Sequence, residues 1–157
     1  MDFYQNQEIL LDPAFSKNEM NFIHGKGLND FIESIPIEGN EDIYYKGQES
    51  NESVNSKFLK LCQTTNGWIH FQNGTSFGVK KGKINEIKLT NNSLGKLSKL
   101  ISKDVEARIG KPSKIEHDII TYVFDPVDEG DIYHYKKTGI SIQFDPDSKR
   151  IKEIRIK

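Results

Sequence analysis

Apolar and polar residues alternate in two separate groups along the chain. In the first group, alternation over residues 68–71, 75–80 and 84–89 is interrupted by Asn73-Gly74 and Lys81-Gly82. Such pairs favour the positive φ angles of tight hairpin turns, and a period of two residues is typical of a half-buried strand. The pattern therefore predicts a three-stranded antiparallel meander.

The second group covers the C-terminal part of the chain. Strand-like runs occur at residues 119–124, 132–135, 140–144 and 151–156. Residues 136–139 and 145–148 contain Gly139 and Pro146-Asp147, which suit reversal of the backbone. The connection from Asp125 to Gly130 is longer, so we expect a carboxylate-rich loop between the first two of four strands.

Helical signals precede both groups of strands. Ser102 is the expected N-cap of a helix that carries Asp104 near its start and ends at Gly110. Residues 28–35 also have helical spacing, and a shorter helix is expected over residues 53–62, with a strand near residues 42–45.

The two groups end in similar segments. Residues 83–89 and 150–156 share the pattern basic-Ile-x-Glu-Ile-basic-apolar, although two unrelated amphipathic strands also match it by chance. We predict a single α+β domain, residues 1–157, with one continuous antiparallel sheet and its helices packed on one face. The sheet is expected to be built from two divergent helix-plus-meander repeats, about residues 15–90 and 91–157.

Composition narrows the class of protein. The 157 residues include 22 Lys and Arg against 23 Asp and Glu, for a net charge of -1, and these charges are mixed along the chain. This balance favours neither nucleic acid nor an anionic membrane as partner. The N-terminus lacks the pattern of a secretion signal, so we expect a cytoplasmic protein. The single cysteine, Cys62, is expected to be a buried thiol, with a reactive nucleophile as the alternative.

No familiar pattern of catalytic or ligand residues is present. The four histidines, His24, His70, His117 and His134, do not have the spacing of a zinc site. Gly25-Lys26-Gly27 is too short for a phosphate loop. We therefore expect no metal, no cofactor and no enzymatic activity.

Residues 102–112 lead from a helix through Gly110-Lys111-Pro112 into an antiparallel sheet. This segment resembles the module of β-lactamase inhibitory protein and of the small outer-membrane barrel-assembly lipoprotein, over residues 94–157 and less closely over 25–90. The resemblance implies tandem modules with one open sheet face that grips an enzyme. The chain lacks the lipidated cysteine of the lipoprotein branch, so immunity proteins, which protect bacteria from toxins, fit the remaining features.

The expected partner is therefore a protein, bound without catalysis as by an immunity protein that neutralises a cognate bacterial toxin. Tyr133 and Tyr135 share one strand face, and we expect this face to be exposed because Ile132 on the opposite face is the better core residue. The further binding residues that we expect are an acidic rim and a second aromatic anchor, namely Asp128, Glu129, Asp131 and Trp68. A small-ligand or envelope-assembly module, or an enzyme of unfamiliar type, are the alternatives.

Overall fold

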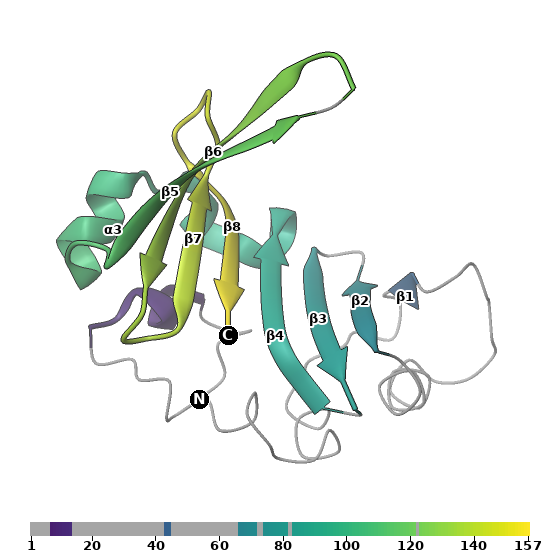
Figure 1. Cartoon of the computed structure of the whole chain (residues 1–157). Coiled ribbons are helices and arrows are strands. Elements are labelled where there is room, and N and C mark those ends of the chain that lie inside the picture. Colours follow the sequence, from purple (N-terminus) through teal and green to yellow (C-terminus); the bar gives the residue numbers. More distant parts are fainter. Residues whose placement is uncertain (1–6, 14–42, 45–65, 72–73, 82, 122) are drawn as a thin grey trace.

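An eight-stranded antiparallel sheet dominates the mixed α+β fold (Figure 1). The computed structural model describes residues 7–13, 43–44, 66–71, 74–81, 83–121 and 123–157. In chain order the elements are η1 (Gln7–Leu11), β1 (Ile43–Tyr44), β2 (Gly67–Phe71), β3 (Thr75–Lys80), β4 (Lys83–Thr90), η3 (Asn91–Lys99), α3 (Ser102–Ile109), β5 (Lys114–Thr121), β6 (Pro126–Tyr135), β7 (Ile140–Phe144) and β8 (Ile151–Ile156). Here η marks a 3-10 helix. The strands follow the order β1-β2-β3-β4-β8-β7-β6-β5, so β5 is an edge strand.

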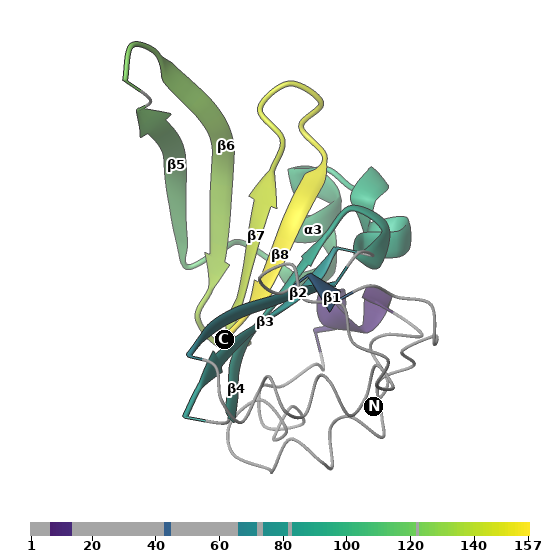
Figure 2. The same ribbon diagram turned by 90° about the vertical axis from the view of Figure 1, so that its right-hand side faces the viewer.

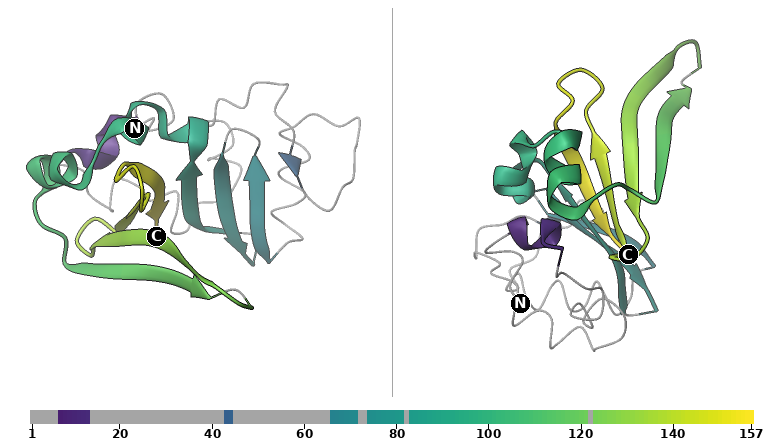
Figure 3. Two further views of the ribbon diagram at one scale, coloured as in Figure 1. Left: turned by 90° about the horizontal axis from the view of Figure 1, so that it is seen from above. Right: turned by 90° about the vertical axis from the view of Figure 1, so that its left-hand side faces the viewer.

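The hydrophobic core lies on one face of the sheet, beneath the described helices. Figures 2 and 3 show η1, η3 and α3 on the same side of the strands. The helices contribute Leu10, Leu11, Leu94, Leu97 and Val105 to this core, all of them buried. The strands contribute buried side chains, mostly at alternate positions, which are Ile69, Phe77, Val79, Ile84, Ile87, Leu89, Tyr135, Ile140, Ile142, Phe144, Ile151, Ile154 and Ile156.

Strands β4 and β8 meet at the centre of the sheet and join the N-terminal strands to the C-terminal ones. Ile87 pairs with Ile156, and Leu89 pairs with Ile154. All four side chains are fully buried. Burying a side chain of this size contributes about 1.5–3 kcal/mol each. The sequence motif shared by residues 83–89 and 150–156 therefore forms the central contact of the sheet.

Helix α3 agrees with its prediction except at its first residue. Ile101, not Ser102, is the N-cap, and its backbone N–H donates to Asp104 Oδ2 at 3.0 Å. At the other end, the N–H of Gly110 donates to the carbonyl of Glu106 at 2.9 Å. Gly110 has a φ of 81°, a conformation that favours glycine, so the helix ends where the sequence predicted.

The strands of the first meander, together with β7 and β8, confirm their predictions, but the expected loop from Asp125 to Gly130 is wrong. Strand β6 begins at Pro126 and pairs with β5 from Thr121 onward. A bulge between Asp118 and Ile119 absorbs one additional residue of β6, so an irregular connection is unnecessary. Asp128 and Glu129 therefore lie on a strand, whereas Asp125 precedes it.

Gly130 allows β6 to approach β7 closely. Its φ is 90°, and a Cβ atom at this position would lie 1.9 Å from the carbonyl oxygen of Phe144. Glycine is thus required here both for its backbone conformation and for its lack of a side chain.

Several expectations concern residues that lie outside the described part of the chain. These are the helices over residues 28–35 and 53–62, Cys62, His24 and Gly25-Lys26-Gly27. Within the described ranges, no helix is both long enough and apolar enough to cross a membrane.

Candidate functional site

The far ends of β5 and β6 form a two-stranded arm that extends beyond the neighbouring strands (Figures 1 and 2). Strand β6 pairs with β7 only over four residues, from Ile132 to Tyr135, although it is ten residues long. The remainder of β6 pairs only with β5. We call residues 118–128 the distal arm.

The distal arm carries large apolar side chains that contact solvent. Phe124 is 92% exposed and Val123 is 87% exposed, and both lie between β5 and β6. The strands of the arm add Ile119, Ile120 and Val127. Several exposed apolar side chains on one protruding element are typical of an interaction surface, because contact with water disfavours such side chains unless a partner covers them.

The charged residues in this part of the sequence are mainly acidic. Residues 115–135 contain six of the 23 Asp and Glu residues and none of the 22 Lys and Arg residues. Along the sequence the apolar tip is therefore flanked by carboxylates, although at the base of the arm Lys114 pairs with Glu116 and Lys152 pairs with Glu129. A surface of this kind favours a positively charged partner and repels a negatively charged one.

Tyr133 and Tyr135 face the core, so the expectation that they line the exposed face of the sheet is wrong. Tyr135 is buried, and its hydroxyl donates to the carbonyl of Gly110 at 3.1 Å. Burial is the largest of the causes that raise its pKa to about 12. Tyr133 packs edge-on against Phe144 with ring centroids 4.9 Å apart. The helices cover this face, whereas Ile132 points to the open one.

The predicted acidic rim lies at the base of the arm, where intramolecular partners compensate much of its charge. Asp131 Oδ1 lies 2.6 Å from His117 Nδ1, and Asp128 Oδ1 lies 3.4 Å from His117 Nε2. The hydrogen bond with Asp131, followed by the charge of Asp128, raises the pKa of His117. Glu129 accepts from Lys152 Nζ at 2.6 Å. A role for these carboxylates in partner binding stays a prediction.

A polar row crosses the open face at the base of the arm. His134 Nε2 lies 2.6 Å from Glu116 Oε2, and His134 Nδ1 lies 2.9 Å from Ser141 Oγ. Lys114 Nζ donates to Glu116 Oε1 at 2.6 Å; this bond, and then the one with His134, lower the pKa of Glu116. Glu116, His134 and Ser141 border a cavity of about 260 Å³ that Arg155 also lines.

The row resembles an acid–histidine–serine relay in connectivity but lacks the surroundings that acyl transfer requires. Ser141 lies inside β7, which pairs with β6 on one side and with β8 on the other. Backbone N–H groups in such a strand are used by the sheet, so they are not available to stabilise an oxyanion. The row instead links the side chains of three neighbouring strands.

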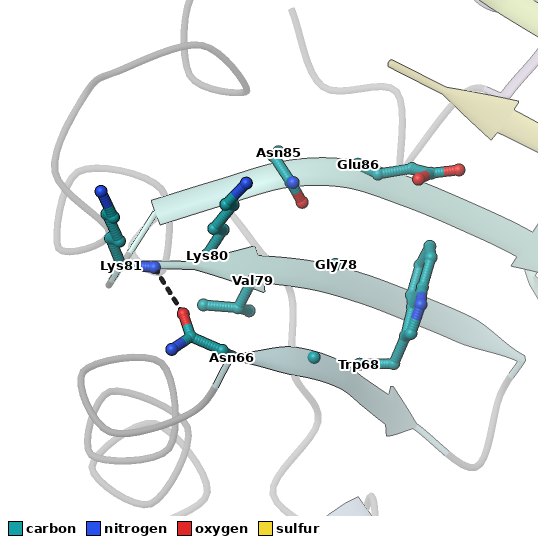
Figure 4. Close-up of a pocket in the computed structure, with 9 residues that line it drawn as sticks. Asn66, Trp68, Gly78, Val79, Lys80, Lys81, Asn85 and Glu86 are labelled. Carbon is teal, nitrogen blue, oxygen red and sulfur yellow. Dashed lines mark hydrogen bonds between the residues drawn. The ribbon is translucent and has the colours of Figure 1, made fainter.

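A second cavity, of about 340 Å³, lies beside Trp68 at the other end of the sheet. Figure 4 shows the indole at one end of this cavity and Lys80 and Lys81 at the other. Strands β3, β4, β8 and β7 separate Trp68 from the arm, so the structure does not bring it together with the other predicted binding residues. We call this cavity the Trp68 hollow.

No cluster of three or more His, Cys, Asp or Glu side chains that could hold a metal ion occurs among the described residues.

Comparison with known proteins does not assign the chain to a family. No family model matches the chain, and no curated protein matches it. A similar solved structure is that of YjgB, a DUF4309 family protein from Bacillus subtilis subsp. subtilis str. 168. Its TM-score is 0.44 and its sequence identity is 12%, over 98% of this chain and 91% of that chain. This level of similarity assigns no function.

The apolar tip was missed because residues 119–124 read as one continuous strand. The signal was nevertheless present, since Ile119-Ile120 and Val123-Phe124 place apolar residues on both faces of that strand. An edge strand is covered on one face at most, so half of these side chains had to be exposed. The position of the strand at the edge was the missing information.

Proposed function

We propose that this chain is a non-catalytic, cytoplasmic inhibitor of immunity type, which binds a bacterial toxin through its distal arm. The observation that carries the proposal is the apolar tip of Val123 and Phe124 within a region that holds six carboxylates and no Lys or Arg. Aromatic anchor residues surrounded by charged side chains are typical of tight protein interfaces.

The sign of the charge indicates the kind of toxin. Enzymes that cleave nucleic acids bind phosphates in basic clefts, and an acidic arm with an apolar tip complements such a cleft. A toxin of this kind acts where nucleic acid is present, which favours the cytoplasm as the site of inhibition. The same charge disfavours direct binding to nucleic acid or to an anionic membrane.

The proposal includes two divergent helix-plus-meander repeats, as in the inhibitory proteins that the C-terminal half resembles. Matching registers support this organisation. Phe77 pairs with Ile87 in the first half, and Ile142 pairs with Ile154 in the second. A register shift follows Gly78 in the first half, and one follows Gln143 in the second.

The test compares the wild-type chain with V123S/F124S as bait for proteins of the native host and its competitors. K136S/K137S is the matched control, because both lysines are exposed at the turn that follows β6, at the opposite end from the tip. We expect the wild type and the control to capture the same basic nuclease and inhibit it at a one-to-one ratio. The tip variant should bind about 30-fold more weakly or worse, which corresponds to a hot-spot loss of about 2 kcal/mol.

Unchanged melting temperatures would show that the tip variant keeps its fold. Inhibition by the tip variant equal to that of the wild type would contradict binding through the distal arm. A captured protein whose activity the wild-type chain leaves intact would contradict the inhibitory function itself.

A further inference from the structure

The Trp68 hollow exists because β3 carries no side chain at its centre. Gly78 pairs with Trp68 on one side and with Glu86 on the other. A Cβ at Gly78 would lie 2.9 Å from Asn85 Oδ1, so the Asn85 amide lies directly above this glycine. The equivalent place opposite Glu153 in β7 is occupied by Gln143. The cavity of about 260 Å³ at that place therefore includes the Gln143 side chain, whereas the Trp68 hollow has no side chain at the matching position, Gly78.

The indole of Trp68 is held in place from the side away from the hollow. His70, two residues further along β2, stacks on Trp68 with a centroid distance of 6.4 Å and an interplanar angle of 10°. Lys88 Nζ lies 5.2 Å from the indole centroid. Neither His70 nor Lys88 lines the hollow. The other face of the indole is therefore a fixed aromatic wall against which a planar ring can stack.

The opposite end of the hollow is positively charged. Lys80 and Lys81 lie there, and Asn66 Oδ1 accepts a hydrogen bond from the backbone N–H of Lys81 at 2.9 Å, which closes this end (Figure 4). Glu86 also lines the hollow, but its carboxylate points away from both lysines and lies 3.7 Å from Arg155 Nη1.

We propose that the Trp68 hollow binds a nucleoside monophosphate, with the base stacked on Trp68 and the phosphate held by Lys80 and Lys81. The Asn85 amide, which both donates and accepts hydrogen bonds, lies between them and meets the polar edge of the base. A volume of about 340 Å³ suits one nucleotide and is at the lower end of the range of small-molecule sites, about 300–1,000 Å³. This site is independent of the distal arm and of inhibition.

The chain contains one tryptophan, so its fluorescence reports on this site alone. We expect adenosine 5′-monophosphate to quench it saturably. Adenosine lacks the phosphate and ribose 5-phosphate lacks the base, so each should bind about tenfold more weakly or worse. Quenching by inorganic phosphate equal to that by the nucleotide would overturn the proposal.

Two variants separate the parts of the site. G78Q fills the hollow with the residue found at the matching place in β7, and its Cβ would lie 3.2 Å from Glu86 Cβ and 3.5 Å from the indole. K80Q/K81Q removes the cations and leaves the hollow open. Both should weaken nucleotide binding by about tenfold or more, whereas K136Q/K137Q should bind as the wild type does. If G78Q does not fold, K80Q/K81Q tests the proposal by itself.

Three further results would overturn the proposal. The first is unchanged fluorescence at nucleotide concentrations up to about 1 mM. The second is equal affinity in K80Q/K81Q and the wild type. The third is binding of single-stranded oligonucleotides in the absence of binding by free nucleotides, which would assign the hollow to a nucleic-acid strand. None of these results bears on the distal arm.

Discussion

Replacing Gly130 with alanine tests the close approach of β6 to β7 that positions the arm. Two effects combine at this position. A non-glycine residue with positive φ costs about 1–3 kcal/mol in backbone strain. In addition, the new Cβ would lie 1.9 Å from the carbonyl oxygen of Phe144 and 3.2 Å from the backbone nitrogen of Pro146. These are backbone atoms, so the strands have to separate.

The separation has further consequences. Gln143 Nε2 donates to the carbonyl of Glu129 at 3.0 Å, and Tyr133 packs against Phe144; both contacts weaken when the strands move apart. A buried hydrogen bond contributes about 1 kcal/mol. We therefore expect G130A to lower the free energy of unfolding by about 3–5 kcal/mol, which is at the severe end for single substitutions.

Gly110 provides the matched control. Its φ is 81°, but a Cβ there would have no neighbour within 4 Å, so G110A isolates the cost of backbone strain. The assay is urea denaturation of the wild type and both variants, followed by circular dichroism. We expect G130A to lose about 2 kcal/mol more than G110A. Equal losses would refute the reasoning, since the contact with Phe144 would then add nothing.

Two further predictions concern pH. The pKa of Tyr135 is raised to about 12, so its phenol should ionise well above the usual value of 10, and Y135F should remove this late step from an ultraviolet titration. Because the pKa of Tyr135 is higher in the folded than in the unfolded chain, its contribution to the free energy of unfolding is present below pH 10 and is lost as the pH rises toward 12. Ionisation of Tyr135 near pH 10 in the folded protein would contradict its burial. The pKa of His117 is raised, mainly by Asp131, so its contribution to stability is complete below its usual value of 6.5 and is lost as the pH rises through the raised value. D131N should return the nuclear magnetic resonance titration of His117 toward 6.5, whereas D147N, at an exposed turn, should leave it unchanged; an unaltered His117 pKa in D131N would show that the pair does not form in solution.

Much of the local structure could be predicted from the sequence, because strand alternation and turn chemistry act over a few residues. The strands β2, β3, β4, β7 and β8 lie where the alternation placed them, and α3 ends at Gly110 as expected. The predicted start of β6 was wrong, because pairing with β5 extends this strand through residues with low strand propensity.

The candidate binding surface required the tertiary structure. Alternation separates Tyr133 and Tyr135 from Ile132 and His134, but it does not say which pair is buried. The helices decide this by covering one face, where the Tyr135 hydroxyl reaches the carbonyl of Gly110, 25 residues earlier in the chain. Ile132 and His134 then lie on the opposite face of the sheet, which the described helices do not cover.

The same distinction applies to the two proposed sites. The sequence by itself determined that residues 115–135 are acidic and that the chain has one tryptophan. Only the tertiary structure decided that Phe124 lies at the tip of a protruding arm and that Gly78 leaves a hollow beside Trp68. The physical reason is that exposure and cavities depend on which strands become neighbours. Strand order is set by packing over the whole sheet, whereas composition and alternation are local properties of the chain.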